Sequence, residues 1–172
     1  KRVLYKKTLA RLLFYGWTYE RKWWHYPASI VSPRCAHVAI EHDGLIYSPM
    51  SGGCQVVPVE GLGEPFAFCT IPVEHFAHAH LMRPFGVAAS LIGWVTNGFV
   101  QGANCVTLIG AVLRRGGVPV PRSVVTPDRM LDWAWERAID HGRTDDSTPS
   151  ATDLEGLGWA RRIREAETLA GT

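Results

Sequence analysis

The chain contains 172 residues, of which 47% are hydrophobic and 20% are charged. This length suits one domain with a hydrophobic core, and the composition excludes a disordered chain. No two of the four cysteines are spaced as Cys-x-x-Cys. Four cysteines in a chain of this length are too few for a disulfide scaffold, and reduced thiols in a reducing compartment are expected.

Positive charge is concentrated near the beginning of the chain. Residues 1–22 contain seven basic residues and one acidic residue, Glu20, which gives this segment a charge of +6. Because the whole chain carries +2, the remainder carries −4. A basic segment of this kind either binds an acidic partner surface or forms a solvated helix face. Nucleic acid is not the expected partner, because no recognition motif accompanies the charge.

Neither a secretory signal nor a transmembrane span is expected. Arg11 interrupts the first apolar stretch, which also lacks a clean cleavage site. The uncharged run over residues 84–113 is long enough to cross a bilayer, but polar breaks at 96–98 and 101–104 favour two buried helices joined by a loop. We therefore expect a chain that is cytoplasmic when it is synthesised.

Residues 1–34 are interpreted as a basic, aromatic N-terminal extension. Tyr5, Leu9, Leu12 and Leu13 recur at helical spacing opposite basic residues, which predicts a short amphipathic helix over residues 3–15. Residues 17–26 are dense in tryptophan and tyrosine. This density is typical either of an aromatic shelf for a sugar, lipid or partner chain, or of a core built from large rings.

Residues 35–73 predict an antiparallel β-meander of about four strands. In the first strand, His37, Ala39 and Glu41 lie on one face, and residues 36, 38 and 40 lie on the other. Asp43-Gly44 is a strong two-residue hairpin signal. Further strands are expected over residues 45–48, 55–59 and 66–71, separated by clusters of glycine and proline.

After residue 72 the pattern becomes helical. Helices are predicted over residues 74–82, 85–95, 105–115 and 129–141, the last opened by Thr126-Pro127-Asp128. Strands followed by helices, rather than alternating with them, indicate an α+β fold in which the meander packs against helices. Residues 35–142 form the predicted domain, and residues 143–172 form a polar linker and a charged C-terminal helix over 154–169.

Cys105 is the first candidate catalytic residue. Gly102 and Asn104 precede it and an apolar helical run follows, so its thiol is expected in the first turn of a buried helix. Unpaired N–H groups and the helix dipole stabilise a thiolate there, and the same N–H groups can bind an oxyanion. The alternative is a small apolar residue at the start of a core helix.

His37 is the second candidate. Small Ala39 beside it leaves room for a helix N-terminus on that face, which would bring Cys105 to the imidazole, and a Cys–His pair is the minimum for nucleophilic acyl transfer. In a two-residue hairpin, Ser48 lies on the same face, diagonal to His37, and is a weak candidate for orienting the ring. Glu41 shares the face and is more typical of a solvated edge. The alternative is a strand histidine with a structural hydrogen bond.

Histidines at positions 75, 78 and 80 suggest a zinc site. A helix brings 75 and 78 to one face and a strand brings 78 and 80 to one face, but neither presents all three. Ordinary surface histidines are the preferred interpretation, and neither a metal nor an organic cofactor is expected.

The hairpin and the helix start together resemble a known superfamily. Residues 37–48, His-Val-Ala-Ile-Glu-His-Asp-Gly-Leu-Ile-Tyr-Ser, are similar to the hairpin of NlpC-type cysteine peptidases, in which the first histidine is the base. The position of Ser48 usually carries His, Asn or Gln in that family. Residues 104–109, Asn-Cys-Val-Thr-Leu-Ile, are similar to the helix start of the circularly permuted papain-like branch, which includes lecithin:retinol acyltransferase-like proteins and bacterial amidases. The order of histidine strand before cysteine helix also resembles this branch.

The resemblance covers about residues 35–132 and implies a permuted NlpC/papain-like cysteine hydrolase, an amidase or peptidase. It implies Cys105 as the nucleophile that forms a thioester, His37 as the general base and Ser48 at the third position. The implied substrate is a peptide or acyl group, with peptidoglycan stem peptides as the first expectation and a protein or lipid acyl group as the alternative.

A different class of function is also consistent with the sequence. The same fold can serve as a non-catalytic structural or interaction subunit, docked to protein partners through the basic N-terminus and the charged C-terminal helix. A bacterial or phage particle that opens a cell wall is the expected setting, and a virion subunit that is both docked and catalytic would unite the two interpretations.

Overall fold

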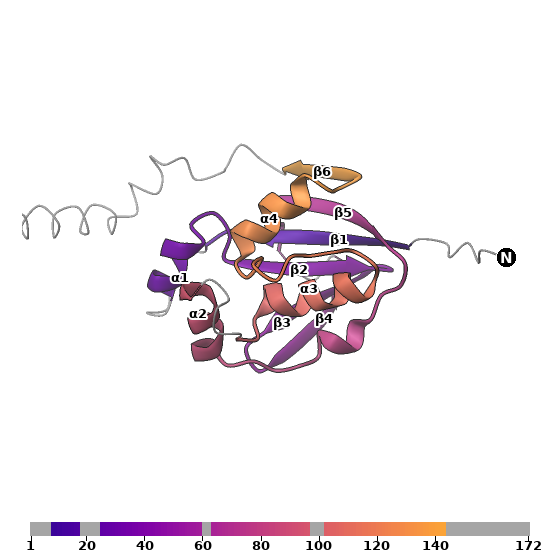
Figure 1. Cartoon of the computed structure of the whole chain (residues 1–172). Coiled ribbons are helices and arrows are strands. Elements are labelled where there is room, and N and C mark those ends of the chain that lie inside the picture. Colours follow the sequence, from indigo (N-terminus) through magenta and orange to yellow (C-terminus); the bar gives the residue numbers. More distant parts are fainter. Residues whose placement is uncertain (1–7, 18–24, 60–62, 97–101, 144–172) are drawn as a thin grey trace, which may run out of the picture.

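A sheet of six antiparallel strands dominates the computed structural model, which describes residues 8–17, 25–59, 63–96 and 102–143 (Figure 1). The strands are β1 (Thr8–Tyr15), β2 (His37–His42), β3 (Leu45–Met50), β4 (Gly53–Pro58), β5 (Ala67–Val73) and β6 (Asp140–Arg143). Their order across the sheet is β4-β3-β2-β1-β5-β6. The helices are α1 (His25–Val31), α2 (Val87–Val95), α3 (Cys105–Arg115), α4 (Pro127–Trp135) and the short 3-10 helix η2 (His78–His80). The predicted α+β class is therefore confirmed.

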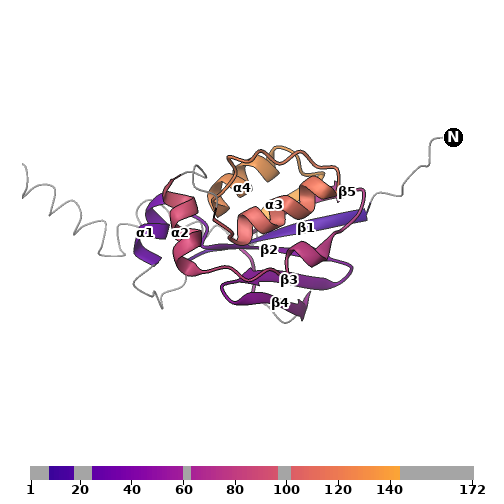
Figure 2. The ribbon, with the colours of Figure 1, turned by 60° about the horizontal axis from the view of Figure 1, so that its bottom comes forward.

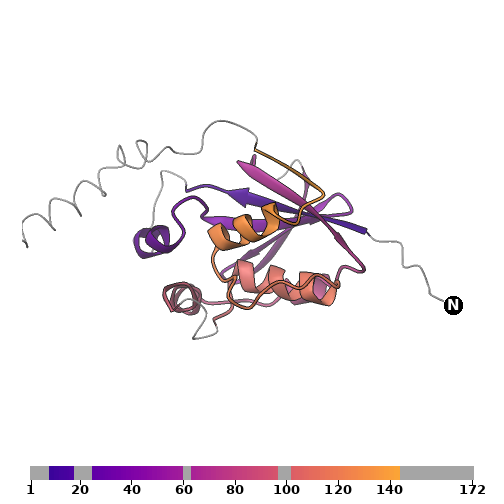
Figure 3. The same ribbon diagram turned by 45° about the horizontal axis from the view of Figure 1, so that its top comes forward.

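Helices α3 and α4 lie over one face of the sheet, whereas α1 and α2 lie next to each other at one end of it (Figure 2, Figure 3). The main core lies under α3 and α4, where Phe14 of β1 and Val38 of β2 pack with the apolar residues of both helices. A smaller cluster containing Leu13 and Ala39 lies on the other face. The two clusters use alternate residues of the same strands, because successive side chains of a strand point to opposite faces.

Strand β1 shows that the helix predicted over residues 3–15 is wrong for the described part, residues 8–15. Ala10, Leu12 and Phe14 are fully buried, whereas Leu9 is 52% exposed, which is the alternation of a strand. Strand β1 pairs with β2 on one side and with β5 on the other. The apolar spacing fits a helix as well as a strand. The two neighbouring strands decide the outcome, because they offer hydrogen-bond partners along both edges of β1.

The β2–β3 hairpin forms as predicted. Asp43 and Gly44 make the turn with φ angles of 50° and 76°, and Glu41 pairs with Ile46. Strand β4 then pairs with β3, but β5 pairs with β1 instead of β4. The predicted four-strand meander is therefore wrong beyond β4. Strand β1 lies between β2 and β5, so residues 8–15 belong to the same sheet as residues 37–73. The sheet therefore extends across the boundary expected at residue 34.

The helices predicted over 85–95 and 105–115 correspond to α2 and α3. Helix α4 is shorter than predicted, since it ends at Trp135 and residues 140–143 form β6 against β5. The helix predicted over 74–82 is reduced to η2. The predicted tail helix over 154–169, and residues 18–24 of the aromatic segment, lie outside the described residues. Among the helices that are described, none has both the length and the apolar character needed to cross a membrane.

Asp128, in the first turn of α4, ties this helix to the segment that leads into β2. Its carboxylate accepts hydrogen bonds from the backbone N–H of Cys35 (2.6 Å), from Ser32 Oγ (3.0 Å) and from the backbone N–H of Arg34 (3.2 Å). The Arg34 guanidinium pairs with Asp128 at 3.1 Å and with the exposed Asp132 at 2.8 Å. This network fixes the position of residues 32–35, which lead into β2, against α4.

Candidate active site

The N-terminus of α3 holds Cys105 where the sequence predicts it. Asn104 is the N-cap: its side-chain oxygen accepts a hydrogen bond from the N–H of Thr107, and Thr107 Oγ1 accepts one from the N–H of Asn104, both at 2.9 Å. The Asn104 side-chain amide also donates to the carbonyl oxygen of Val125 at 3.3 Å. This capping box fixes the first turn of the helix and therefore the position of the Cys105 thiol.

Two opposing effects act on the Cys105 thiol. Burial has the larger effect: the residue is 4% exposed, and loss of water raises the pKa of Cys105 to about 11. Hydrogen bonding to the backbone N–H groups of Val38, Val106 and Cys105 itself lowers the pKa by a smaller amount. The expected N–H groups are thus present, but burial has the larger effect and favours the neutral thiol over the expected thiolate. Cys105 is a neutral thiol at neutral pH.

His37 opens strand β2 and lies between Tyr15 of β1 and Ser48 of β3. Its Nε2 atom is 2.8 Å from Ser48 Oγ, and the centroids of the His37 and Tyr15 rings are 6.3 Å apart. Ser48 is buried. Burial lowers the pKa of His37 to about 4, so the imidazole is neutral at neutral pH. With Nε2 bound to Ser48, Nδ1 is the ring nitrogen left to accept a proton.

Helix α3 packs on the opposite face of β2 from the one expected. Val38 belongs to the cluster that contains α3, whereas Ala39, which shares the alternation of His37, belongs to the cluster on the other face. Cys105 nevertheless lies close to the histidine, because its thiol interacts with the amide of Val38, the residue directly after His37. No hydrogen bond joins the thiol to the imidazole in the part of the chain that the structure describes.

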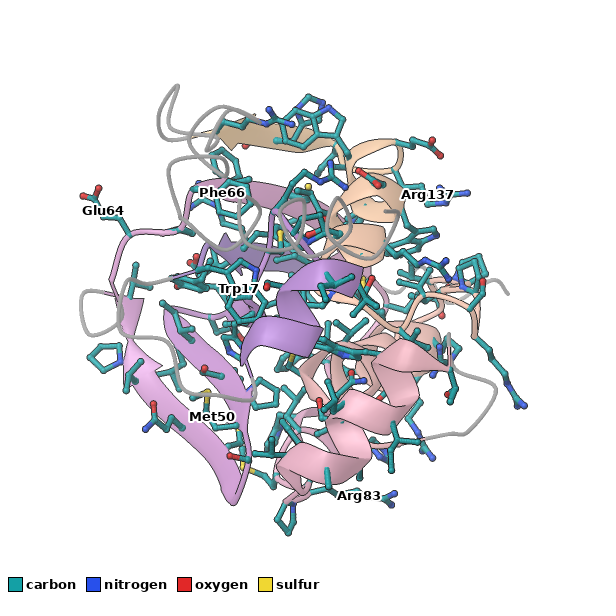
Figure 4. The ribbon with its side chains drawn as sticks, turned by 90° about the vertical axis from the view of Figure 1, so that its left-hand side faces the viewer. Trp17, Met50, Glu64, Phe66, Arg83 and Arg137 are labelled. Carbon is teal, nitrogen blue, oxygen red and sulfur yellow. The ribbon has the colours of Figure 1, made fainter. Side chains whose placement is uncertain are left out.

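Cys105 and His37 line one cavity of about 330 Å³ at the end of the sheet near α1 and α2. Most of its other lining side chains are apolar or aromatic, among them Trp17, Phe85 and Trp94. Figure 4 looks onto this end of the molecule and shows Trp17 beside α1. The indole N–H of Trp17 donates to the carbonyl oxygen of Ser32 at 2.9 Å, which holds the ring in place. The volume is within the range of small-molecule sites.

The aromatic lining residues are the part of this site that sequence reasoning missed. The one signal in the sequence is the density of aromatic residues from position 17 onward, which is consistent both with a binding surface made of aromatic rings and with a core built from them. Phe85 and Trp94 lie in an uncharged run that gives no sign of a cavity. They line the same cavity as Tyr15 at the end of β1 because α2 packs against α1, and the local sequence pattern does not encode that packing.

The remaining candidates take no part in the cavity. Glu41 forms an ion pair with Arg11 at 3.8 Å. His78 and His80 lie on η2, and His75 is an exposed residue before it. Within the described ranges, no three His, Cys, Asp or Glu side chains are grouped so that they could hold a metal ion.

Comparison of the chain with protein-family models, with curated proteins and with solved structures gives no match in any of the three. The chemistry of the site is therefore argued from its own geometry.

Proposed function

We propose that the chain is a cysteine hydrolase, an amidase or peptidase, with a permuted NlpC/papain-like fold. The observation that carries the proposal is the cavity shared by Cys105 and His37, with Ser48 hydrogen-bonded to Nε2 of the imidazole. The order of the histidine hairpin before the cysteine helix supports the permuted arrangement. Peptidoglycan peptides, encountered as part of a bacterial or phage assembly, are the substrate and setting that the resemblance implies.

The proposed reaction begins from a neutral thiol and a neutral imidazole. Cys105 Sγ attacks the carbonyl carbon of an amide or ester, and His37 Nδ1 takes the thiol proton as the S–C bond forms. Backbone N–H groups at the start of α3 stabilise the negative charge on the carbonyl oxygen. Ser48 Oγ accepts the Nε2–H hydrogen bond, which favours the tautomer with a free lone pair on Nδ1.

The tetrahedral intermediate then breaks its C–N or C–O bond. The imidazolium of His37 gives its proton to the leaving amine or alcohol, and a thioester remains on Cys105. His37 next takes a proton from water as the water attacks the thioester. The acid leaves, and the proton returns to the Cys105 sulfur, which restores both neutral groups.

Thioester trapping tests this function directly. The protein is mixed with p-nitrophenyl butyrate, and the acylated residue is identified by mass spectrometry. We expect a butyryl group on Cys105, none at that position in Cys105→Ser, and acylation slowed by about 100-fold in His37→Ala because the general base is lost. Cys54→Ser is the matched control and is expected to retain the wild-type rate, since Cys54 lies on β4 and is not a lining residue of the cavity. Acylation of Cys54 with Cys105 unmodified would contradict the proposal.

A non-catalytic interaction subunit with the same fold is the second candidate. The burial of Cys105 and its raised pKa favour this function, because a core cysteine has the same properties. In that case Cys105 takes up no butyryl group until the protein is unfolded in urea, and His37→Ala changes nothing in the assay. The same experiment therefore separates the two candidates.

A further inference from the structure

A second cavity, of about 400 Å³, lies between α2, the start of α3 and the segment that joins α3 to α4. It shares no lining residue with the cavity beside Cys105, and its volume is within the range of small-molecule sites. Three of its lining residues are arginines. Arg83 comes from the segment before α2, Arg114 from the last turn of α3, and Arg122 from the segment after α3.

The chain around this second cavity lacks negative charge. Residues 75–127 contain no aspartate or glutamate, and every described lining residue of the cavity lies in this stretch. Residues 97–101, which join α2 to α3 in the sequence and are outside the described part, belong to the same stretch and are uncharged. No acidic residue of this stretch therefore balances the three positive charges.

The three guanidinium groups make few interactions with the protein. Nη1 of Arg114 donates to the carbonyl oxygen of Val120 at 3.2 Å, and its Nε and Nη2 make no hydrogen bond within the described chain. Arg83 and Arg122 form neither an ion pair nor a side-chain hydrogen bond with any described residue. Elsewhere in the described chain, three arginines each pair with a carboxylate: Arg11, Arg34 and Arg137.

Arg114 and Arg122 lie close enough to repel each other. Burial and, to a smaller extent, the positive charge of Arg122 lower the pKa of Arg114 from its ordinary value. Arginine nevertheless stays protonated in proteins, so both groups remain charged. Two like charges side by side are unfavourable, and an anion between them would replace their repulsion by attraction.

We propose that this second cavity binds a small soluble anion that carries phosphate groups, and that Arg83, Arg114 and Arg122 contact its oxygen atoms. A phosphate group is favoured because it brings a charge of about −1.5 to −2 at neutral pH and three acceptor oxygens, which match the donors of several guanidinium groups. The site is separate from the proposed hydrolase site and does not depend on its activity.

Calorimetric titration of the full chain with pyrophosphate tests this proposal. We expect saturable binding of pyrophosphate, and weaker binding of citrate, whose negative charges lie on carboxylates. Arg83→Gln, Arg114→Gln and Arg122→Gln are each expected to weaken pyrophosphate binding by about tenfold or more, as for a lost hydrogen bond to a charged group. Arg83 and Arg122 are exposed and make no side-chain hydrogen bond in the described chain, so these two variants are expected to fold as the wild type does.

Arg115→Gln is the matched control. Arg115 is exposed and lies beside Arg114 in the last turn of α3, but it does not line the cavity, and its replacement lowers the net charge by the same amount. We expect it to change the affinity for pyrophosphate by less than about twofold at about 0.15 M salt, where separated surface charges are screened.

Three results of the titrations would overturn the proposal: pyrophosphate does not bind, citrate binds as tightly as pyrophosphate, or Arg115→Gln weakens binding as much as Arg122→Gln does. Sedimentation with vesicles of phosphatidylcholine and phosphatidic acid distinguishes a lipid headgroup from a soluble ligand. Binding to these vesicles without binding of pyrophosphate would also overturn the proposal, in favour of a membrane surface.

Discussion

At the scale of single residues, access of water to each sulfur controls the reactivity of the cysteines. Cys35 and Cys69 are fully buried, Cys105 lines a cavity with 4% exposure, and Cys54 is partly exposed on β4. Burial raises the pKa of all four, to about 12 for Cys69 and to about 11 for Cys105. Because the thiolate is the reactive form, these thiols are expected to differ widely in rate.

Alkylation by iodoacetamide, followed for each cysteine by mass spectrometry, measures this difference. We expect Cys54 to react first, Cys105 next, and Cys35 and Cys69 after unfolding. The rate at Cys105 should rise by about tenfold per pH unit between about pH 7 and 10, because its thiolate fraction does so below the pKa. A plateau at Cys105 near pH 7 would show that the thiolate is already formed and that burial does not dominate.

His37 gives the fold a pH dependence with a definite sign. The pKa of His37 is lowered from 6.5 to about 4 by burial, so the unfolded chain binds more protons than the folded one between these values. Stability is therefore present above about pH 6.5 and is lost as the pH falls toward 4, by up to about 3 kcal/mol. Urea unfolding at several pH values checks this.

The variants His37→Ala and His75→Ala separate this effect from the general effect of acid. His37→Ala is expected to flatten the fall in unfolding free energy between about pH 6.5 and 4, even if it lowers stability at pH 7. His75→Ala, at an exposed position, should keep the wild-type slope. Equal slopes in all three proteins would refute the assignment to His37.

At the scale of elements, the hydrogen bonds between α4 and the segment that leads into β2 converge on one side chain, Asp128. The Asp128 side chain is 10% exposed and accepts hydrogen bonds from three residues, whereas the Asp132 side chain is 63% exposed and forms an ion pair with Arg34. Asp128→Ala leaves the Cys35 N–H without its side-chain acceptor and leaves the Arg34 guanidinium with Asp132 as its ion-pair partner. We expect it to lower the free energy of unfolding by about 3 kcal/mol.

Asp132→Ala is the matched control, one helical turn further along α4, and should cost about 0–1 kcal/mol, as an exposed ion pair does. Chemical denaturation of both variants measures the difference. Similar losses for the two variants would show that the buried network is not the main tie between α4 and β2.

The elements that could be predicted are those whose determinants lie within a few residues. Asp43-Gly44 encodes the β2–β3 turn, and Asn104 encodes the start of α3, because each sets a local backbone geometry. Strand β1 was assigned wrongly because the position of Leu12 in a strand depends on partners at residues 40 and 69. The close approach of Cys105 to the start of β2 was expected, but from the wrong face, since strand alternation alone does not tell which face a helix covers.

At the scale of the whole molecule, the proposed site combines two residues of one hairpin with a third residue that is distant in the sequence. His37 and Ser48 come from one hairpin and meet through its turn, whereas Cys105 arrives on α3, which packs across the same strands. The pairing of His37 with Ser48 could therefore be anticipated from the hairpin register. The cavity could not, because its walls come from β1, α1, the β3–β4 turn and α2, and their assembly is a property of the complete fold.

The central position of β1 has a consequence for the solubility of the chain. Without β1, strands β2 and β5 would each present an unpaired edge; β5 is largely apolar, and so is the centre of β2, Val38, Ala39 and Ile40. Open edges of this kind template pairing with other chains. A variant that begins at residue 35 is therefore expected to aggregate, as measured by light scattering, while full-length Leu9→Lys, altered at an exposed position of β1, stays monomeric. A soluble, cooperatively folded variant from residue 35 would refute this. By pairing with both β2 and β5, residues 8–15 are thus expected to keep these strands from pairing with other chains.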